Sequence, residues 1–361
     1  MTFRNIFYLY QPEKTAAKVA DLSKYTKELS NLFSTSANIL LISHINPDGD
    51  AVGSQLALYH YLTENGRKVS MITPNYLQEF LKWMTGADQI EIYIKERKKC
   101  RKLIEQADLI VFLDFNHSNR LGESEEFVKA SGAKKILIDH HLDPENFTDI
   151  AISDTTKCST AELVHELVCG MNGDEPFKSK PYAEALYVGI ITDTGNFEHG
   201  SYSSRTFRTV AELLESGLEK EKILDRIYNN FSSDRLRLQG FALNRRMVVM
   251  PELKTAYIYL SREDLREYNY VKGDTEGFVN MPLSIKGICF SAIFIEKEGF
   301  IKMSFRSKGQ FPSNEFATLY FSGGGHLNAS GGEYPDTLEN TIKYFLQVLK
   351  ENVWRFGDGE L

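Results

Sequence analysis

Histidine and aspartate side chains, which serve as ligands of metal ions, gather at four places in the N-terminal part of the chain. The densest group, His44-Ile-Asn-Pro-Asp48-Gly-Asp50, combines an imidazole with two carboxylates. This mixture suits a transition ion such as Mn²⁺ better than Mg²⁺, which prefers an all-oxygen shell. The nearby Gly49 and Gly53 are typical of a tight turn that another backbone segment approaches closely. The alternative is a helix-capping loop with an incidental histidine.

Two further aspartates follow apolar runs. Asp114 ends the run Leu109–Leu113, where an unpaired carboxylate would be costly, although it could also cap a helix. Asp193 follows the helix-like run Ala185–Ile191, and the nearby Gly195 permits an unusual backbone conformation. Either aspartate alone is a weak signal, but both lie where a ligand would be expected.

The fourth group, Asp139-His140-His141, follows the apolar run 135–138. One histidine could bind a metal ion while a carboxylate orients its other ring nitrogen; two ordinary surface histidines are the alternative. The predicted metal ligands of all four groups are His44, Asp48, Asp50, Asp114, His140 and Asp193. Their four carboxylates would repel one another unless neutralised, and two divalent ions supply the matching charge. Such a metal pair can carry a bridging hydroxide that attacks phosphorus in line.

A group of a different kind lies near the C-terminal end. Arg306 and Lys308 share one side of a predicted strand, and both bind phosphate oxygens well. The glycine run Gly323–Gly325 would let backbone N–H groups approach an anion, with His326 as a further donor. A solvated strand face and an ordinary glycine loop are the alternatives. The two features together favour a phosphate or nucleotide cradle.

The elements that must position these side chains form two predicted domains. Short apolar runs at 39–43, 68–72, 109–113 and 135–138 alternate with helical patterns, which is typical of a parallel sheet covered on both faces. Ligands of such sheets gather at the carboxyl ends of the strands. The predicted first-domain helices are Ala51–Glu64, Ser159–Gly170, Pro181–Thr192, Ser204–Ser216 and Glu221–Asn230.

The predicted fold class is α/β, with a doubly wound, mainly parallel sheet followed by a smaller C-terminal α/β domain and an active site in the cleft between them. The first domain spans 1–235 with a helical extension at 1–35, a linker covers 236–250, and the second domain covers 251–361. The second domain's predicted elements are the strands Thr255–Leu260, Ile285–Glu296 and Phe300–Ser307 and the helices Ser313–Phe321 and Thr337–Trp354.

The composition restricts the partners of the chain. A net charge of -7 over 361 residues argues against binding to long duplex nucleic acid, but it allows a small phosphorylated substrate. The four scattered cysteines predict reduced thiols. No apolar run is long enough to span a bilayer and the start is a poor signal peptide, so we expect a cytoplasmic protein without membrane contact. A homodimer is a reasonable expectation.

The motifs HINPDGDAVGS, LDF, IDHH, ITDTG and FRSK…GGGHLNASGG together resemble the DHH phosphoesterase family with its DHH-associated C-terminal domain. The resemblance covers about Asn38 to Gly332 and is greatest to the bifunctional oligoribonuclease and pAp phosphatase group, the nano-RNases. It implies one metal ion on His44 and Asp48, a second on Asp50, His140 and Asp193, and a bridging Asp114. The family metal is typically manganese.

The resemblance also implies roles for the remaining motif residues. His141 would contact the scissile phosphate, and Asp139 belongs with it in the catalytic group. The implied substrate-binding residues are Arg306, Ser307, Lys308, Gly324, Gly325 and His326. The expected function is hydrolysis of very short RNA or small nucleotides such as pApA and pAp. A nucleotide-sensing module without turnover and an exopolyphosphatase are the alternatives.

Overall fold

The apolar runs of the N-terminal part form buried strands in the computed structural model, which describes residues 22–198 and 202–352. They are β1 (Ile39–Ile42), β2 (Val69–Thr73), β4 (Leu109–Leu113) and β5 (Lys134–Asp139). With β3 (Ile90–Ile92) and β6 (Ile150–Ser153) they make a six-stranded sheet, parallel throughout, in the order β3-β2-β1-β4-β5-β6. The doubly wound parallel sheet is thereby confirmed.

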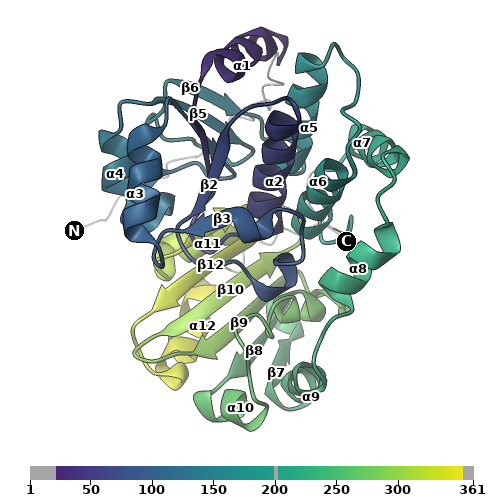
Figure 1. The fold of residues 1–361 in the computed structure, drawn as a ribbon. Helices are drawn as coiled ribbons and strands as arrows, with labels where there is room; N and C mark the ends of the chain where they lie inside the picture. The colour runs from purple at the N-terminus through teal and green to yellow at the C-terminus, as the bar shows by residue number, and fades with distance from the viewer. Residues whose placement is uncertain (1–21, 199–201, 353–361) are drawn as a thin grey trace, which may run out of the picture. The chain divides into compact units, whose positions relative to one another are not determined.

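Helices cover both faces of this sheet because the central strands are apolar on both sides. Leu41 and Val111 face α1 (Ser23–Thr35), α2 (Gly49–Glu64), α5 (Thr160–Met171) and α6 (Lys180–Asp193). Leu40 and Ile110 face α3 (Arg97–Gln106) and α4 (Glu125–Ala130) on the opposite side (Figure 1). Two more helices, α7 (Ser204–Glu215) and α8 (Lys220–Tyr228), add to the first of these layers. Residues 1–21 of the predicted N-terminal extension lie outside the described residues.

The strand order creates a crevice at the carboxyl ends of β1 and β4. The chain winds from β1 outward to β3, then returns to the other side of β1 and winds outward through β4, β5 and β6. The connections after β1 and β4 therefore diverge, which is the position where such sheets place their ligands. The predicted metal-binding groups at 44–50, 114 and 139–141 lie at the carboxyl ends of β1, β4 and β5, at this edge, and Asp193 ends α6.

Two glycines allow α2 and α6 to pack at close range. A Cβ atom at Gly53 would lie 2.5 Å from the carbonyl oxygen of Ala185 and 2.9 Å from the backbone nitrogen of Gly189. A Cβ atom at Gly189 would lie 2.9 Å from Oδ1 of Asp50. The expected close backbone approach at Gly53 is therefore present, and it brings the end of α6 towards the start of α2.

The first compact unit ends at Asn229 and the second begins at Asn230, whereas the predicted first domain ends at 235 and the predicted second domain begins at 251. The second unit's mixed six-stranded sheet has the order β11-β12-β10-β9-β8-β7, and β8 and β9 are its parallel pair. The strands are β7 (Met247–Met250), β8 (Thr255–Leu260), β9 (Phe290–Glu296), β10 (Ile301–Ser307), β11 (Gly324–His326) and β12 (Ala329–Tyr334).

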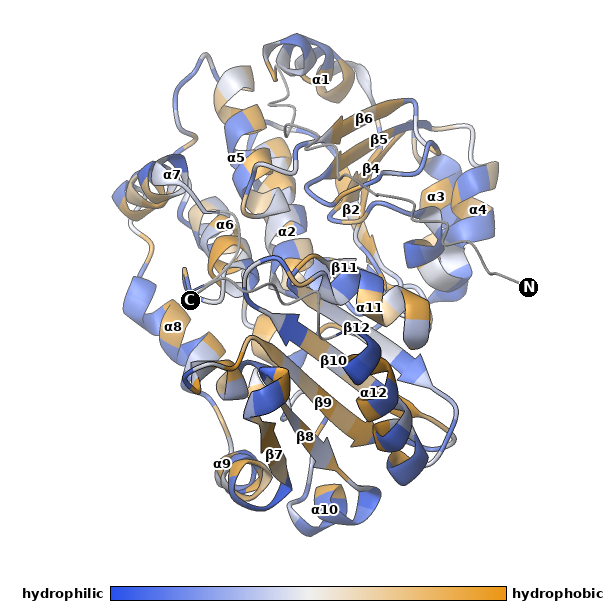
Figure 2. Ribbon diagram, turned by 180° about the vertical axis from the view of Figure 1, so that it is seen from behind, coloured by the Kyte–Doolittle hydropathy of each residue, from blue (hydrophilic) through white to orange (hydrophobic). Residues whose placement is uncertain are grey.

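Two layers of helices enclose this second sheet. An aromatic core that includes Phe290, Phe305 and Phe345 joins one face to α11 (Ser313–Tyr320) and α12 (Leu338–Asn352). The other face packs on α9 (Ser233–Phe241), α10 (Arg262–Glu267) and the 3-10 segment Phe278–Ser284. Figure 2 shows the hydrophobic strands β8 and β9 next to helices of mixed polarity. No helix in either described range is long and apolar enough to cross a bilayer.

Some predicted segments take a different form. The predicted linker 236–250 holds most of α9, a π-helical turn at Ala242–Arg246 and strand β7, which pairs with β8. The predicted strand Ile285–Glu296 begins only at Phe290, because Gly287 has a φ of 82° and the chain turns there. Gly324 and Gly325 of the glycine run, for which an anion cradle is predicted and an ordinary loop is the alternative, lie in β11, an edge strand of the second sheet. Strands β7 and β11 form because each pairs with a neighbouring strand, and the sequence of the segment alone does not reveal that partner.

Gly53→Ala should destabilise the first unit by about 1–3 kcal/mol, because the added methyl group meets backbone atoms of α6 that cannot move independently. The matched control is Gly240→Ala in α9, where nothing lies within 4 Å of the new methyl group. We expect that control to be neutral or stabilising by up to about 1 kcal/mol, because alanine favours helix more than glycine does. Thermal unfolding monitored by circular dichroism measures both, and equal effects would contradict the packing argument.

Candidate metal centre

Three predicted ligands from β1, its following loop and β4 meet at one point. Nε2 of His44 lies 3.4 Å from Oδ2 of Asp114 and 3.9 Å from Oδ1 of Asp48. His44 and Asp114 are buried, whereas the Asp48 side chain is 54% exposed. One donor atom from each residue lies within 4.8 Å of the others, which is close enough for the three to share a metal ion.

The other three predicted ligands form a second group. Nε2 of His140 lies 3.8 Å from Oδ2 of Asp50 and 3.5 Å from Oδ2 of Asp193. It also lies 3.7 Å from Oδ1 of Asp114, the other oxygen of the carboxylate in the first group. Asp114 therefore lies between two groups, each with an imidazole and carboxylates. All six predicted ligands are brought together within the first unit.

Backbone carbonyls orient both histidines. Nδ1 of His44 lies 2.8 Å from the carbonyl oxygen of Ile45, and Nδ1 of His140 lies 3.3 Å from that of Lys157. A proton on Nδ1 of His140 satisfies the Lys157 carbonyl and leaves the lone pair on Nε2, the nitrogen that faces the carboxylates. Nδ1 of His44 also lies 3.0 Å from a nitrogen of Arg120, which only donates, so the Ile45 carbonyl and Arg120 favour opposite tautomers of His44. Burial lowers the pKa of His44 to about 4, so its imidazole is neutral at neutral pH and able to act as a ligand.

Asp50 is held by the N-terminus of α5. Its two carboxylate oxygens accept hydrogen bonds from the backbone nitrogens of Thr160, at 2.6 Å, and Ala161, at 2.8 Å. These are orphan N–H groups of the first helical turn, where the helix dipole also favours a negative charge. The hydroxyl of Thr160 donates to Oδ1 of Asp114 at 2.9 Å. One helix start thus supports a carboxylate from each group.

Asp114 itself has an uncommon backbone, with a φ of 69°. Aspartate tolerates this left-handed conformation better than most residues, and here it turns the side chain at the end of β4 into the cluster. Its backbone nitrogen donates to the carbonyl oxygen of Ile138 at 3.1 Å, so the end of β4 is tied to β5. The helix-cap alternative for Asp114 does not describe its contacts.

The clustered carboxylates interact unfavourably with one another. Burial, and then the negative charges of Asp50, Asp48 and Asp193, raise the pKa of Asp114 well above its usual range. Burial also raises the pKa of Asp50. Buried carboxylates that share a small volume with imidazoles are the donor set that a pair of divalent cations would stabilise. The residues present therefore fit the two-metal interpretation.

His141 and Asp139 form a separate pair at the end of β5. Nδ1 of His141 lies 2.7 Å from Oδ1 of Asp139 and 3.8 Å from Oδ1 of Asp114. Burial alone would raise the pKa of Asp139, but the hydrogen bond and charge of His141 bring it below its usual value. Asp139 is fully buried, while the His141 side chain remains 22% exposed. Asp139 can orient His141, and His141 can reach a substrate.

Sequence reasoning missed Thr160 and Arg120. A guanidinium nitrogen of Arg120 lies 3.0 Å from Nδ1 of His44, and its positive charge helps to keep that imidazole neutral. The cap Ser159, whose hydroxyl accepts from the backbone nitrogen of Glu162, is a recognisable helix start that could have drawn attention to Thr160. Nothing in the sequence near Arg120 indicates its role.

In the second unit, the predicted substrate residues make structural contacts of their own. Arg306 donates to the carbonyl oxygen of Phe305 at 2.9 Å, and Lys308 to that of Leu283 at 2.5 Å. Ser307 is buried and its hydroxyl donates to the carbonyl oxygen of Phe311 at 2.7 Å, so it is occupied within the unit. Arg306 is half-buried and Lys308 is exposed, which leaves both cations within reach of solvent.

The glycine run has a packing role. A Cβ atom at Gly323 would collide with the carbonyl oxygen of Gly331, and one at Gly325 would lie 2.5 Å from the carbonyl oxygen of Ala329. Gly324 pairs with Gly331 across the β11–β12 ladder, and the backbone of His326 pairs with Ala329. Since β11 is the edge strand among the described strands, it pairs on one side only, and an edge offers backbone donors on the other.

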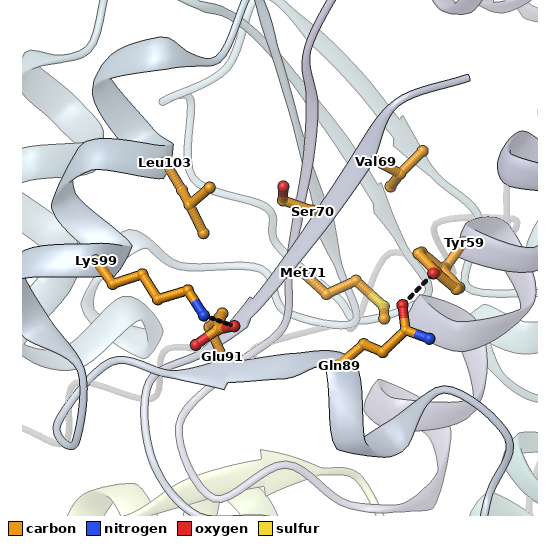
Figure 3. A pocket seen from close by; sticks show the side chains of 8 residues that line it. All are labelled: Tyr59, Val69, Ser70, Met71, Gln89, Glu91, Lys99 and Leu103. Atoms are coloured by element: carbon orange, nitrogen blue, oxygen red, sulfur yellow. Dashed lines mark hydrogen bonds and ion pairs between the residues drawn. The ribbon is translucent and has the colours of Figure 1, made fainter. Parts of the chain in front are cut away.

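Two shallow pockets among the described residues are lined by other side chains. One, of about 140 Å³, lies between α2, β2, β3 and α3 (Figure 3). A hydrogen bond joins Tyr59 to Gln89 and an ion pair joins Lys99 to Glu91 among the residues that line it (Figure 3). The other is formed by residues of α11. Neither contains a candidate metal ligand.

A parallel sheet with histidine and aspartate side chains grouped at its carboxyl edge, followed by a mixed-sheet unit, is an arrangement suited to a metal-dependent phosphoesterase. Residues 38–190 match the DHH family N-terminal domain and residues 253–355 match the DHHA1 domain. The chain belongs to the DHH family and carries its DHHA1 domain.

The chain is also similar to individual proteins along most of its length. An exopolyphosphatase-related protein from Bacteroides fragilis is 43% identical, with a TM-score of 0.88 over 91% of this chain and 96% of that chain. The bifunctional oligoribonuclease and PAP phosphatase NrnA of Bacillus subtilis is 27% identical over 84% of this chain and 91% of its own length. The fold also resembles RecJ from Thermus thermophilus, solved in complex with Mn²⁺, with a TM-score of 0.55 and 14% identity over 95% of this chain and 56% of that chain.

Asp114→Asn should stabilise the metal-free protein and abolish its stabilisation by Mn²⁺. Asparagine also tolerates the left-handed backbone but carries no charge, so the repulsion with neighbouring carboxylates is relieved. In units of this size the melting temperature should rise by about 2–4 °C for each kcal/mol gained. Thermal shift assays with EDTA and with Mn²⁺ measure both effects. The control Asp88→Asn, at an exposed carboxylate, should respond to Mn²⁺ like the unmodified protein.

Thr160→Val should weaken Mn²⁺ affinity about 10-fold or more, because the shape is kept while the hydroxyl that supports Asp114 is lost. Thr160→Ser, which keeps the hydroxyl, should remain close to the unmodified protein. Activity measured as a function of Mn²⁺ concentration distinguishes the two. Equal Mn²⁺ dependence of the valine and serine variants would show that the hydrogen bond has no influence on the centre.

Proposed function

We propose that this phosphoesterase hydrolyses very short oligoribonucleotides and small nucleotides such as pApA and pAp. The observation that carries the proposal is the pair of ligand groups joined by Asp114, in a chain similar to NrnA over most of its length. NrnA is described as acting on oligoribonucleotides and on PAP, and both substrate types are phosphoesters of adenosine-containing or other ribonucleotides.

The proposed roles of the residues follow from their positions. His44 and Asp48 would hold one divalent ion and Asp50, His140 and Asp193 the other, with Asp114 as a ligand available to both. When bound, Mn²⁺ or Mg²⁺ would neutralise charge on the phosphoryl group and make water a better nucleophile at neutral pH. Asp139 keeps His141 oriented through the 2.7 Å hydrogen bond, so that the imidazole contacts the scissile phosphate or its leaving oxygen.

The C-terminal unit supplies binding of the substrate's terminal phosphate in this proposal. Arg306 can form paired hydrogen bonds to phosphate oxygens, and Lys308 adds a point charge. The edge strand β11, with Gly324, Gly325 and His326, supplies backbone donors. Ser307 would act through the backbone, since its hydroxyl is already engaged with Phe311.

An aromatic cluster that follows Asp193 in the chain suits a substrate that contains a base. Phe197, four residues after that ligand, lies 5.0 Å from Phe207 between ring centroids, and Tyr202 lies 5.9 Å from Phe207. Tyr202 and Phe207 are 41% and 50% exposed. Exposed aromatic rings are the surfaces on which bases of single-stranded nucleic acid stack. Polyphosphate has no group that would use them.

Exopolyphosphate cleavage is the second candidate. It is favoured by the 43% identity to the exopolyphosphatase-related protein from Bacteroides fragilis. Polyphosphate would use the same metal ligands and the same cations, so the site alone does not separate the two substrates. Nucleotide binding without turnover is less well supported than either hydrolytic function, because every expected metal ligand is present and grouped with its expected neighbours.

Turnover of pApA, pAp, short RNA and polyphosphate with Mn²⁺ tests the proposal. We expect the ribonucleotide substrates to be cleaved with a kcat/KM at least about 10-fold above that for polyphosphate, and Asp114→Ala to lose about 100-fold or more in kcat. Faster cleavage of polyphosphate would replace the leading proposal with the second candidate. Binding of pApA with no detectable product would instead support a sensing role.

The role of Arg306 has a matched control on the same strand face. Arg306→Ala should raise KM for pAp by about 10-fold or more with a smaller change in kcat, because the guanidinium binds a phosphate that does not react. Lys302→Ala, an exposed cation four residues earlier on β10, should leave KM unchanged. A similar rise in KM for both variants would mean that general positive charge, rather than a specific contact, attracts the substrate.

A further inference from the structure

A histidine, a cysteine and a glutamate converge at a second place in the first unit, away from the DHH ligands. Nε2 of His165 lies 2.9 Å from Oε2 of Glu212 and 3.5 Å from Sγ of Cys169. His165 and Cys169 are one turn apart on α5, so they share a face of that helix. Glu212 comes from α7, which lies beside α5 and α6 (Figure 1). The proposed catalytic function makes no use of these residues.

The separations of the donor atoms are near those of a tetrahedral zinc site. With zinc bonded to nitrogen at about 2.05 Å, to sulfur at about 2.3 Å and to oxygen at about 2.1 Å, the ligand atoms lie about 3.6 Å (N to S) and about 3.4 Å (N to O) apart. The observed N-to-S distance of 3.5 Å already agrees with this geometry. The N-to-O distance must open by about 0.5 Å, which the glutamate can do because its side chain is 40% exposed.

The protonation of the cluster excludes a reactive thiolate–imidazolium pair. Burial raises the pKa of Cys169 to about 11 and lowers the pKa of His165, so both groups are neutral at neutral pH. A catalytic cysteine requires the opposite shifts. A neutral imidazole, by contrast, is the form that binds a metal ion, and an incoming divalent ion displaces the thiol proton.

Tyr182 supports the imidazole from behind. Its buried hydroxyl lies 3.2 Å from Nδ1 of His165. Without metal, Nε2–H donates to Glu212 and Nδ1 accepts from the hydroxyl. With metal on Nε2, the proton moves to Nδ1 and donates to the same hydroxyl oxygen, which can act in either sense. The hydroxyl of Tyr182 can therefore hydrogen-bond to Nδ1 of His165 with or without a metal ion on Nε2. It fixes the orientation of the ring in both cases, as partners of metal-bound histidines do.

We propose that His165, Cys169 and Glu212 form a second metal site for Zn²⁺ or a similar soft divalent ion, separate from the phosphoesterase centre. A thiolate and a carboxylate neutralise the charge of the ion, and solvent at the exposed glutamate completes its four ligands. The nearby cation Arg205 is paired with Glu166 at 2.9 Å, which reduces its repulsion of an incoming ion. The site joins α5, whose first turn holds Asp50, to α7.

Sulfur gives this site a spectroscopic signature that the phosphoesterase centre lacks, because the six DHH ligands offer only nitrogen and oxygen. Co²⁺ replaces zinc in such sites, and a thiolate ligand adds an intense charge-transfer absorption in the near ultraviolet. Titration of the full chain with Co²⁺ should produce this band with the intensity of one cobalt–thiolate bond per chain, because Co²⁺ that binds the phosphoesterase centre adds no sulfur band. Cys169→Ser should remove it, while Cys289→Ser, a buried cysteine of the other unit, should retain it.

Two further variants keep the result interpretable. Asp114→Asn should retain the band, which separates the second site from the catalytic centre. Glu212→Gln alters a partly exposed side chain that should not affect folding, and it should weaken Co²⁺ binding at the sulfur site by at least about 10-fold. Absence of the band at saturating Co²⁺, or its persistence in Cys169→Ser, would overturn the proposal. Unchanged Co²⁺ binding by Glu212→Gln would show that the glutamate is not a ligand and would overturn the site of three protein ligands.

Discussion

The repulsion among buried carboxylates is the interaction on which the rest of the first unit depends. Asp50 and Asp114 are buried near two further carboxylates, and without compensation this arrangement would favour protonation or unfolding. The N-terminus of α5 compensates part of it, through two backbone N–H groups and the hydroxyl of Thr160. A pair of divalent cations would compensate the remainder, so the fold is preorganised for them at a cost in stability.

The need to hold these carboxylates close together also explains glycines and backbone conformations that take no direct part in metal binding. Gly53 and Gly189 bring α6 against α2, so that Asp193 at the end of one helix can meet Asp50 at the start of the other. The left-handed backbone of Asp114 places a strand-end carboxylate between both histidines. The Lys157 carbonyl orients His140 so that its Nε2 faces the carboxylates, and Nε2 of His44 faces Asp48 and Asp114. The positions of the glycines and carbonyls thus serve the ligands.

The second unit is held together by aromatic packing rather than arranged around buried carboxylates. Its core is an aromatic cluster around Phe290, Phe305 and Phe345, which fixes β10 and therefore Arg306 at the edge of the core. The glycine run that resembles an anion cradle is also required for the close β11–β12 packing. One short segment can thus meet a packing demand and offer backbone donors for a phosphate, and substrate kinetics rather than the pattern must separate the two roles.

The parallel sheet and the six candidate metal ligands could be predicted from the chain alone, because apolar strands and the polar residues at their ends are local patterns. The contacts that group the ligands required the folded structure, since the meeting of Asp50 with His140 and Asp193 depends on the packing of α2 against α6. Thr160 and Arg120 were equally invisible, because each acts on a residue distant in the chain. The strand β11 and the start of β9 depended on pairing partners and on the turn at Gly287. Local sequence patterns therefore determine which residues can act as metal ligands, and contacts between distant segments determine which of these ligands share one metal ion.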